Sequence, residues 1–349
     1  MIPVNEPLLT GRERGYAMDA LNTGWISSAG KYLERFERSW AEYCGRKYGA
    51  GVSNGSTALI LALAALDLPE GSEVIVPSFT IVSCVEAILR NGLKPVLVDA
   101  DPLTCCMDVD QVAGRINSRT SAVMAVHIYG HPVNMEPLLD LARKSGLKVI
   151  EDAAEAHGSE CLVHGEWKRC GSMGDVSAFS FYANKNITTG EGGMVLTDDI
   201  GIFDRLCLLR NLGFGKMERF RHETRGWNFR LTNMQAAIGC AQIERIEEIL
   251  ARKIEIMERY NSGLKGLPLG LPFVAGWAKS SLWMYAITLD RELDLGASRF
   301  MELLRGKGVD SRSFFLGMHR QPVYLAEGLF AGESCPVSDD LYRRGLYLP

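Results

Sequence analysis

Apolar residues follow two different periods between residues 53 and 197. Helical spacing of apolar residues predicts helices at 57–66, 83–92 and 135–146, the last ended by Gly146. Short runs rich in β-branched residues predict strands at 73–78, 94–101, 121–130 and 147–154. Strands that alternate with helices in this way are typical of an α/β fold, with a mainly parallel sheet covered by helices on both faces.

The pattern changes in the last third of the chain. Apolar residues keep helical spacing over about 232–264, which predicts one long helix leading out of a large domain. A stretch rich in glycine and proline follows at 263–272, then a strand at 283–289 and a helix at 298–308. Because 349 residues exceed what a single core usually holds, we predict a large domain over 1–240 and a smaller C-terminal α+β domain over 241–349.

Composition excludes several classes of protein. Hydrophobic residues make up 47% of the chain and charged residues 23%, with a net charge of −4, as in an ordinary soluble globular protein. No basic block indicates a nucleic-acid partner. The most apolar stretch, 58–68, is shorter than the roughly twenty residues that cross a membrane. We therefore expect neither nucleic acid nor membrane as a partner.

The cysteines and histidines do not indicate a metal site. Nine cysteines and six histidines are scattered without metal-like spacing, and Cys105–Cys106 is the only adjacent pair. The odd number of cysteines and the absence of a signal peptide indicate reduced thiols and a cytoplasmic location.

Four polar residues lie at or just after the ends of predicted strands: Asp99, His127, Asp152 and Lys185. Active residues of parallel α/β sheets tend to lie at the carboxyl ends of the strands. We therefore expect the active site to lie near these four residues.

The segment SNGSTALIL (53–61) places Gly55, Ser56 and Thr57 at the start of a predicted helix. The free N–H groups and positive dipole of a helix start suit a phosphate group, but a plain helix cap has the same composition. No G-x-G-x-x-G and no G-x-x-x-x-G-K-[ST] motif occurs, which argues against dinucleotide and P-loop sites.

Asp152 ends the apolar strand LKVIED. It is either a loop carboxylate that caps a helix or the partner of a protonated ring nitrogen, such as that of pyridoxal phosphate.

Lys185 follows the aromatic run SAFSFY and precedes the glycine-containing stretch ITTGEGG. Most lysines are solvated surface charges, but a lysine at a buried strand edge can lose its proton and form an imine with an aldehyde. Taken together, the helix start at 55–57, Asp152 and Lys185 fit a pyridoxal phosphate site.

The order and spacing of these motifs resemble a known family. SNGSTAL, EVIVPSFT, HIYGHP, VIEDAAEAHGS, FYANKNITTGEGGM and NFRLTNMQAAIG are similar to segments of the DegT/DnrJ/EryC1/StrS nucleotide-sugar aminotransferases. The resemblance covers nearly the whole chain and implies fold type I, the aspartate aminotransferase-like fold of pyridoxal phosphate enzymes. WISSAGKYLERFE and HIYGHPVNMEPL are most similar to the members that make GDP-perosamine.

The resemblance also implies roles for individual residues. Lys185 matches the lysine that forms the Schiff base with the cofactor and then carries the proton between cofactor and sugar. Asp152 matches the partner of the pyridine nitrogen, and Glu155 stands near the 3-hydroxyl of the cofactor. The residues that match phosphate contacts are Ser56, Thr57, Ser180 and, from the neighbouring subunit, Asn228. The resemblance therefore implies a homodimer with a shared active site, and a cofactor that alternates between pyridoxal and pyridoxamine phosphate.

For the substrates, the resemblance implies L-glutamate and a nucleotide-linked 4-keto-6-deoxysugar, with GDP-4-keto-6-deoxy-D-mannose preferred and a role in O-antigen or surface polysaccharide synthesis. Candidate substrate contacts are Trp25, Ser27, Ser28, Arg312 and His319. Each of these residues also has an ordinary reading as packing or as a solvated polar group. The residues themselves do not separate GDP from UDP or dTDP.

Two departures from the family pattern stand out. Ile81 occupies the place where an aromatic residue commonly stacks on the cofactor ring, so we expect an apolar contact there or a substitute such as Phe79. The chain also stops at GLYLP, where the resemblance implies a further helix. A truncated C-terminus is therefore one interpretation of this end.

The sequence leaves three alternatives to this function. A 3-dehydratase of the same GDP-sugar has a similar sequence but carries histidine in place of the lysine, and Lys185 argues against it. A non-catalytic cofactor-binding regulator would lack Lys185 or Asp152 or carry an added DNA-binding segment. An NAD-linked oxidoreductase is disfavoured by the missing glycine fingerprint.

Overall fold

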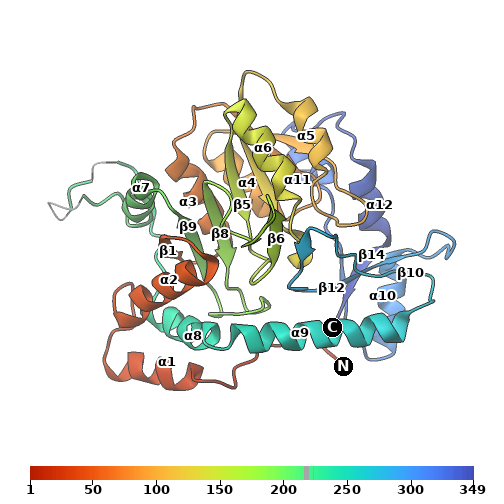
Figure 1. Ribbon diagram of the computed structural model, residues 1–349, viewed down its shortest axis with the longest axis horizontal. Helices are drawn as coiled ribbons and strands as arrows, with labels where there is room; N and C mark the ends of the chain where they lie inside the picture. The colour runs from red at the N-terminus through yellow and green to blue at the C-terminus, as the bar shows by residue number, and fades with distance from the viewer. Residues whose placement is uncertain (216–219, 223) are drawn as a thin grey trace.

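The computed structural model describes residues 1–215, 220–222 and 224–349, and a seven-stranded sheet forms its centre (Figure 1). The order across this sheet is β1 (Tyr48–Val52), β9 (Gly193–Thr197), β8 (Val176–Ser180), β5 (Lys148–Asp152), β4 (Thr120–Val126), β2 (Glu73–Pro77) and β3 (Lys94–Val98). Neighbours from β8 to β3 are parallel, whereas β9 pairs antiparallel with both β8 and β1. The expected mainly parallel, mixed sheet is therefore confirmed.

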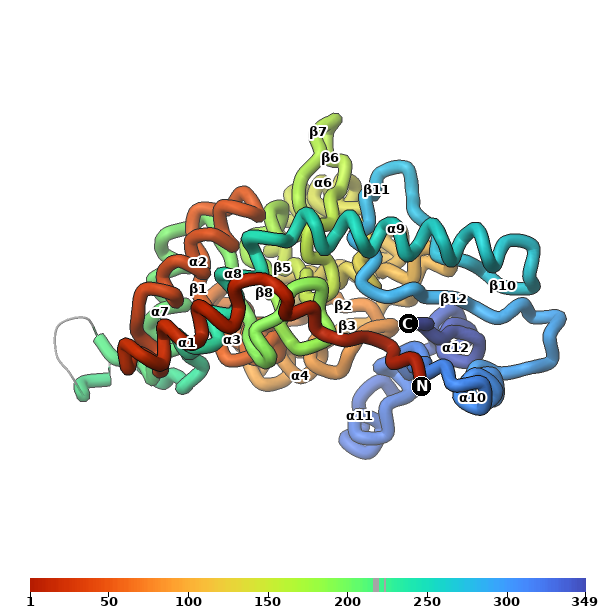
Figure 2. Tube along the Cα trace, turned by 90° about the horizontal axis from the view of Figure 1, so that it is seen from below, coloured from red at the N-terminus to blue at the C-terminus, as the bar shows by residue number. Residues whose placement is uncertain are grey.

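Helices cover both faces of this sheet (Figures 1 and 2). Those in the described part of the chain are α1 (Glu13–Asn22), α2 (Lys31–Cys44), α3 (Gly55–Leu66), α4 (Val82–Arg90), α5 (Val109–Arg115), α6 (Met135–Ser145), α7 (Ile200–Arg210), α8 (Asn233–Ile243), α9 (Ile246–Leu264), α10 (Ala297–Gly306), α11 (Pro322–Ala326) and α12 (Pro336–Arg344).

Alternate residues of the central strands enter two separate cores. On β9, Val195 packs in the core that contains α3, α4 and α6, whereas Met194 and Leu196 pack in the core that contains α2 and α8. Successive side chains of a strand point to opposite faces, so a strand buried on both faces shows a continuous apolar run. This is why short β-branched runs indicated β2, β3, β4 and β5 in the sequence.

A second, smaller sheet is built from the C-terminal third. Its order is β10 (Leu269–Gly270), β12 (Tyr285–Leu289), β14 (Gly345–Leu348) and β13 (Arg312–Ser313), with antiparallel pairing throughout. It has its own core, in which strand residues such as Ile287 and Leu346 meet Ala297 of α10. A third sheet joins β6 (Glu160–Val163) and β7 (Glu166–Arg169) to β11 (Ala278–Lys279).

The helix expected over 232–264 is divided in the structure. Helix α8 ends at Ile243 and α9 begins at Ile246, with Glu244 and Arg245 in a turn between them. Tyr16 Oη and Arg35 donate to the Glu244 carboxylate, at 2.9 and 2.6 Å, and hold this turn. The apolar spacing continues across the turn, so periodicity alone does not reveal the break.

The domain boundary at residue 240 stays a prediction. Residues from each side of this boundary pack against elements of the other side. Ile2 pairs with Val309 beside the smaller sheet. Phe314, Met318 and Tyr324 pack in a core of the central sheet. Contacts of this kind tie the two parts of the chain together.

Asp99 makes one of these contacts. Its place at a strand end indicated an active residue, but in the structure it binds the start of α12. Its Oδ2 accepts the N–H of Val337 at 2.8 Å, and its Oδ1 accepts the N–H and hydroxyl of Ser338 at 2.9 and 2.6 Å. The buried carboxylate thus caps the start of α12 from the end of β3, where the helix dipole favours negative charge.

We predict that Asp99→Asn destabilises the protein by about 2–3 kcal/mol, because an amide NH₂ replaces an oxygen that receives buried donors. Thermal or urea unfolding measures the change. Asp110→Asn, at an exposed position in the first turn of α5, is the control and changes stability by less than about 0.5 kcal/mol. Equal stability of the two variants would contradict the role of Asp99 as the cap of α12.

Candidate active site

A cavity of about 600 Å³ lies at the carboxyl ends of β4, β5 and β8. The predicted site residues on its wall are Gly55, Ser56, Thr57, Asp152, Glu155, Ser180 and Lys185. Trp283, Phe315 and Tyr347 line it from the C-terminal third of the chain. The structure therefore brings together the three features that the sequence indicated separately.

The start of α3 forms one end of this cavity. Asn54 caps the helix by accepting the N–H of Thr57 at 2.9 Å, and Thr57 Oγ1 accepts the N–H of Asn54 at 3.1 Å. The first N–H groups of a helix have no partner inside it, which leaves those of Gly55 and Ser56 for an anion. A Cβ on Gly55 would lie 2.7 Å from Ser180 Cβ, so only glycine lets helix and strand approach this closely.

Asp152 lies buried at the end of β5. Its Oδ1 accepts the N–H of Ala154 at 3.0 Å, and its Oδ2 accepts the thiol of Cys84 at 3.1 Å. No ion pair of Asp152 is present in the part of the chain that the structure describes. Burial raises the pKa of Asp152. A buried carboxylate on a cavity wall without a cation within ion-pair distance suits a positively charged group inside the cavity.

Lys185 stands on the loop between β8 and β9. The loop begins at Phe181, whose main-chain oxygen accepts the N–H of Thr189 at 2.9 Å, and Gly190 turns it back with a φ of 83°. A Cβ on Gly193 would lie 2.4 Å from the Asn54 oxygen, so the returning strand packs directly against the start of α3. These glycines bring the lysine close to the helix start.

The Lys185 amine is enclosed by an acid and an aromatic ring. Nζ lies 3.8 Å from Glu155 Oε1 and 3.8 Å from the centre of a Trp283 ring, and the side chain is 10% exposed. Burial lowers the pKa of Lys185, although the charges of Glu155 and Asp152 act in the opposite direction. A lowered pKa increases the fraction of neutral amine, which is the nucleophilic form.

Glu155 shares the buried cavity with this lysine. Its Oε2 accepts the N–H of Tyr129 at 2.8 Å. Burial raises the pKa of Glu155 to about 7, while the charge of Lys185 and the Tyr129 N–H oppose the shift. A carboxyl group with this pKa exchanges protons near neutral pH.

His127 is a wall residue whose tautomer is set by its neighbours. Its Nδ1 accepts the N–H of Val133 at 3.1 Å, so the proton lies on Nε2 and is donated to Glu151 Oε2 at 3.1 Å. Glu151 also accepts the N–H groups of Gly171, Met173 and Gly174. Burial favours a raised pKa of Glu151, but the hydrogen bond from His127 and the charge of Arg46 lower it.

Ile81 stands where the family commonly has an aromatic residue that stacks on the cofactor ring. Ile81 lines the cavity, so it presents an apolar side chain there. Phe79 is fully buried against Tyr129, Phe314 and Phe315 and is not on the cavity wall. The idea that Phe79 replaces the aromatic residue is therefore wrong for this structure.

The predicted substrate contacts lie elsewhere in the single chain. Trp25 is 57% exposed and lines a separate hollow beside α2, with Ser27 and Ser28 next to it in sequence. Arg312 is exposed on β13 and donates to Asp310 Oδ1 at 3.1 Å. None of these four residues reaches the wall of the Lys185 cavity.

His319 and Asn228 are also outside the cavity wall. His319 is buried between Ser78 Oγ and the Asp339 carboxylate, at 2.8 and 3.2 Å, so it holds two segments together rather than facing a substrate. Asn228 is exposed and accepts from Arg230 at 2.8 Å. Its exposure is compatible with a contact to a neighbouring subunit.

Several wall residues had no signal in the sequence. Trp283 and Tyr347 belong to apolar stretches that are typical of any buried strand. They reach the cavity only because the smaller sheet lies against the ends of the central strands. This placement depends on contacts between segments far apart in the chain.

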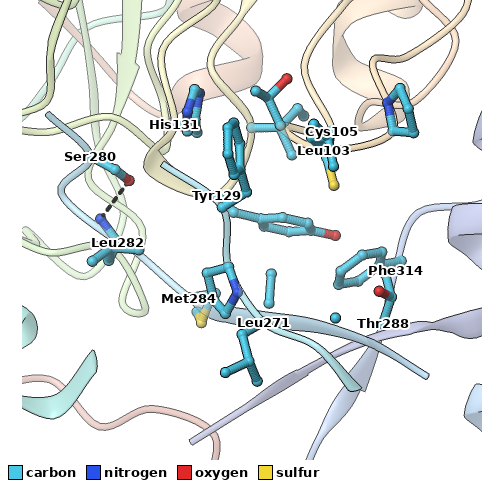
Figure 3. A pocket seen from close by; sticks show the side chains of 17 residues that line it. Leu103, Cys105, Tyr129, His131, Leu271, Ser280, Leu282, Met284, Thr288 and Phe314 are labelled. Carbon is cyan, nitrogen blue, oxygen red and sulfur yellow. Dashed lines mark hydrogen bonds between the residues drawn. The ribbon is translucent and has the colours of Figure 1, made fainter. Parts of the chain in front are cut away.

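A smaller hollow of about 120 Å³ lies between the central and smaller sheets (Figure 3). Mainly apolar side chains line it, including Tyr129, Leu271, Met284 and Phe314, and it contains none of the predicted site residues. Among the described residues, no cluster of three histidine, cysteine or acidic side chains is arranged to hold a metal ion. No helix in these ranges has both the length and the apolar character needed to span a membrane.

Two similar proteins match the whole of this chain. GDP-perosamine synthase of Vibrio cholerae is 42% identical over 349 residues, which is 100% of this chain and 94% of that protein. GDP-perosamine synthase of Caulobacter vibrioides is 40% identical over 353 residues, which is 100% of this chain and 92% of that protein.

A solved structure supports the expected fold class. S. venezuelae DesV in complex with a ketimine intermediate matches with a TM-score of 0.89 and 34% identity, over 97% of this chain and 88% of DesV. The model of the DegT/DnrJ/EryC1/StrS aminotransferase family matches residues 7–349. The resemblance in the sequence motifs is thus confirmed, and the chain belongs to the DegT/DnrJ/EryC1/StrS aminotransferase family.

Proposed function

We propose that this protein is a pyridoxal phosphate-dependent aminotransferase that moves an amino group from L-glutamate to C4 of a nucleotide-linked 4-keto-6-deoxysugar. GDP-4-keto-6-deoxy-D-mannose is the preferred substrate, and GDP-perosamine is the product. The observation that carries the proposal is the meeting of Lys185, Asp152 and the α3 start in one cavity. The identities of 42% and 40% to proteins named GDP-perosamine synthase support the choice of sugar.

The cavity residues fit the chemical groups of this cofactor. The N–H groups of Gly55 and Ser56, with the hydroxyls of Ser56, Thr57 and Ser180, would hold the phosphate. Asp152 would hold the protonated ring nitrogen, because it is a buried carboxylate without a cation within ion-pair distance among the described residues. When bound, pyridoxal phosphate supplies an aldehyde that takes up amino groups and a ring that accepts an electron pair.

Lys185 carries the reactive amine and the moving proton in this proposal. Its neutral form, favoured by burial, is the nucleophile, and the same atom takes and returns a proton at the carbon that gains or loses nitrogen. Glu155, 3.8 Å away, would lie near the 3-hydroxyl of the bound cofactor, and its charge raises the pKa of Lys185 against the effect of burial. Ile81 offers an apolar contact on the cavity wall.

The contacts of Asn228 and of the Trp25 segment would come from a second copy of the chain. We propose a homodimer in which Asn228 reaches the phosphate of the neighbouring site and the Trp25 segment, with Ser27 and Ser28, contacts the neighbouring substrate. The exposure of Trp25 and Asn228 in the single chain supports this arrangement. Arg312 is the proposed substrate contact from the same chain, because it pairs with Tyr347, which lines the cavity. The expected location is the cytoplasm, where sugar nucleotides are made.

Lys185→Ala is predicted to abolish the visible absorption band that the wild-type protein shows with pyridoxal phosphate, and to lower the rate of amine transfer at least about a hundredfold. The reason is that the variant lacks both the amine and the proton carrier. Spectra and product formation measure the two effects. Lys307→Ala, at an exposed position after α10, serves as the control, and an unchanged band in Lys185→Ala would refute the role of this lysine.

The substrate is tested with L-glutamate and a panel of GDP-, UDP- and dTDP-linked 4-keto-6-deoxysugars, with products detected by mass. We expect amine transfer to the GDP-sugar, together with formation of 2-oxoglutarate. Transfer to UDP- or dTDP-sugars alone would show that the nucleotide is wrong while the reaction class stands. Loss of water without uptake of nitrogen would indicate a dehydratase instead.

Glu155→Gln is predicted to change how the stability of the cofactor-free protein depends on pH. The folded state keeps the Glu155 proton up to about pH 7, whereas an ordinary glutamate loses it near 4.5, so the wild type loses stability as pH rises through this window. Glutamine does not titrate. The variant therefore gains about 3 kcal/mol relative to the wild type between pH 4.5 and 8, because each unit between the two pKa values contributes about 1.4 kcal/mol.

Urea unfolding at several pH values measures this difference, which should be flat above about pH 8. The exposed Glu70→Gln is the control and should show no such gain. A difference between wild type and Glu155→Gln that does not vary with pH would contradict the burial effect.

A further inference from the structure

The main-chain oxygen of Asn184, the residue before Lys185, receives two side-chain donors from distant parts of the chain. Asn5 Nδ2 donates to it at 2.6 Å, and Trp283 Nε1 donates to it at 2.6 Å. A carbonyl oxygen has two lone pairs, so these two donors use its full accepting capacity. The direction of this carbonyl is therefore fixed from both sides.

Fixing this carbonyl also fixes the backbone from which the Lys185 side chain starts. The oxygen of Asn184 and the N–H of Lys185 belong to one planar peptide unit. That N–H donates to the Tyr182 oxygen at 2.9 Å. Three hydrogen bonds thus hold the peptide plane, and Nζ reaches a position 3.8 Å from Glu155 Oε1.

The donor Asn5 belongs to a segment that is anchored at both ends. At one end the N–H of Ile2 donates to Gly308 at 2.7 Å, beside the smaller sheet. At the other end Gln242 Nε2 of α8 donates to the Leu8 oxygen at 2.8 Å. Figure 2 shows this red segment running across the lower side of the molecule, from the N-terminus to α1. We call residues 2–8 the N-terminal strap.

The strap is joined to the Lys185 loop a second time, through Gln242. Gln242 Oε1 accepts the N–H of Thr188 at 3.2 Å, three residues after Lys185. The other donor is held as well, because Lys253 Nζ of α9 donates to the Trp283 oxygen at 3.1 Å. The loop is therefore suspended between the strap, α8 and the Trp283 segment.

We propose that Asn5 is a positioning residue for the reaction, and that the N-terminal strap sets the direction from which Lys185 enters the active site. This inference rests on the proposed function, in which Lys185 is the reactive amine. Asn5 touches neither substrate nor cofactor in this account. It acts through the Asn184 carbonyl, and its loss lets the Asn184–Lys185 peptide rotate.

The test uses Asn5→Asp and Asn5→Ala in the full chain loaded with pyridoxal phosphate. Aspartate keeps the size of asparagine but loses its amide donors. The matched control is Asn91→Ala, which removes an asparagine amide that also donates to main-chain oxygens, those of Ile60 and Ala87, at 3.1 and 2.8 Å. Asn91 caps the far end of α4, away from the cavity.

Both Asn5 variants are expected to lower kcat for amine transfer about threefold to tenfold, the effect of losing one hydrogen bond, with KM for the sugar nucleotide changed less than about twofold. The pH midpoint of the visible absorption band should shift in both, because it depends on the position of Lys185 relative to Glu155. Asn91→Ala should lower the melting temperature about as much as the Asn5 variants do, but it should change neither kcat nor the pH midpoint of the absorption band.

Trp283→Phe keeps a ring beneath Lys185 and removes the second donor, which completes a double-mutant cycle. Because both donors act on one oxygen, Asn5→Ala should cost more in kcat in this background than in the wild type. Additive effects would overturn the shared role of the carbonyl.

Two different failures can be told apart. If the wild type shows a visible band that Lys185→Ala removes, but the Asn5 variants keep the wild-type kcat and pH midpoint, then the strap only stabilises the fold and the inference is wrong. If the wild type shows no such band, the proposed function itself fails, and the inference falls with it.

Discussion

The site depends on keeping one amine and two carboxyl groups together in a buried space. Lys185, Glu155 and Asp152 lie on the wall of one cavity. Burial lowers the pKa of Lys185 and raises the pKa of Glu155 and of Asp152, so it favours the neutral form of each group. A charge removed from water is unfavourable unless a partner compensates it. The Lys185–Glu155 pair compensates in part, whereas Asp152 has only uncharged donors within hydrogen-bond reach. This imbalance is what prepares the cavity for a cationic ring.

The fold serves that arrangement by bringing separate segments to one edge of the sheet. The parallel strands β4, β5 and β8 end side by side, and the antiparallel return of β9 brings the Lys185 loop back against the start of α3. The smaller sheet then closes the cavity with Trp283 and Tyr347. Asp99 secures this closure at a distance, by capping α12 from the end of β3. Asp152 and Asp99 thus occupy equivalent strand ends, one on the cavity wall and the other at the start of a helix.

The sequence predicted what local pattern and spacing encode. The strands with continuous apolar runs, the helix ended by Gly146, and the candidate groups at Gly55, Asp152 and Lys185 lie where the patterns indicated. Features that depend on distant contacts were not predictable. The turn at Glu244 keeps helical periodicity, and Trp283 looked like an ordinary strand residue. The bond from Asn5 to Asn184 joins positions 179 residues apart. The burial of His319 between Ser78 and Asp339 also depends on distant segments, and an isolated histidine in the sequence does not reveal it.

The central claim is that Lys185 is the amine to which pyridoxal phosphate attaches. The most direct test is to incubate the protein with this cofactor, reduce it with borohydride, digest it and map the phosphopyridoxyl group by mass spectrometry. We predict that the group is found on the peptide containing Lys185 and that the Lys185→Ala variant carries none there. Stoichiometric labelling of a different lysine, or no labelling of the wild type, would contradict the account.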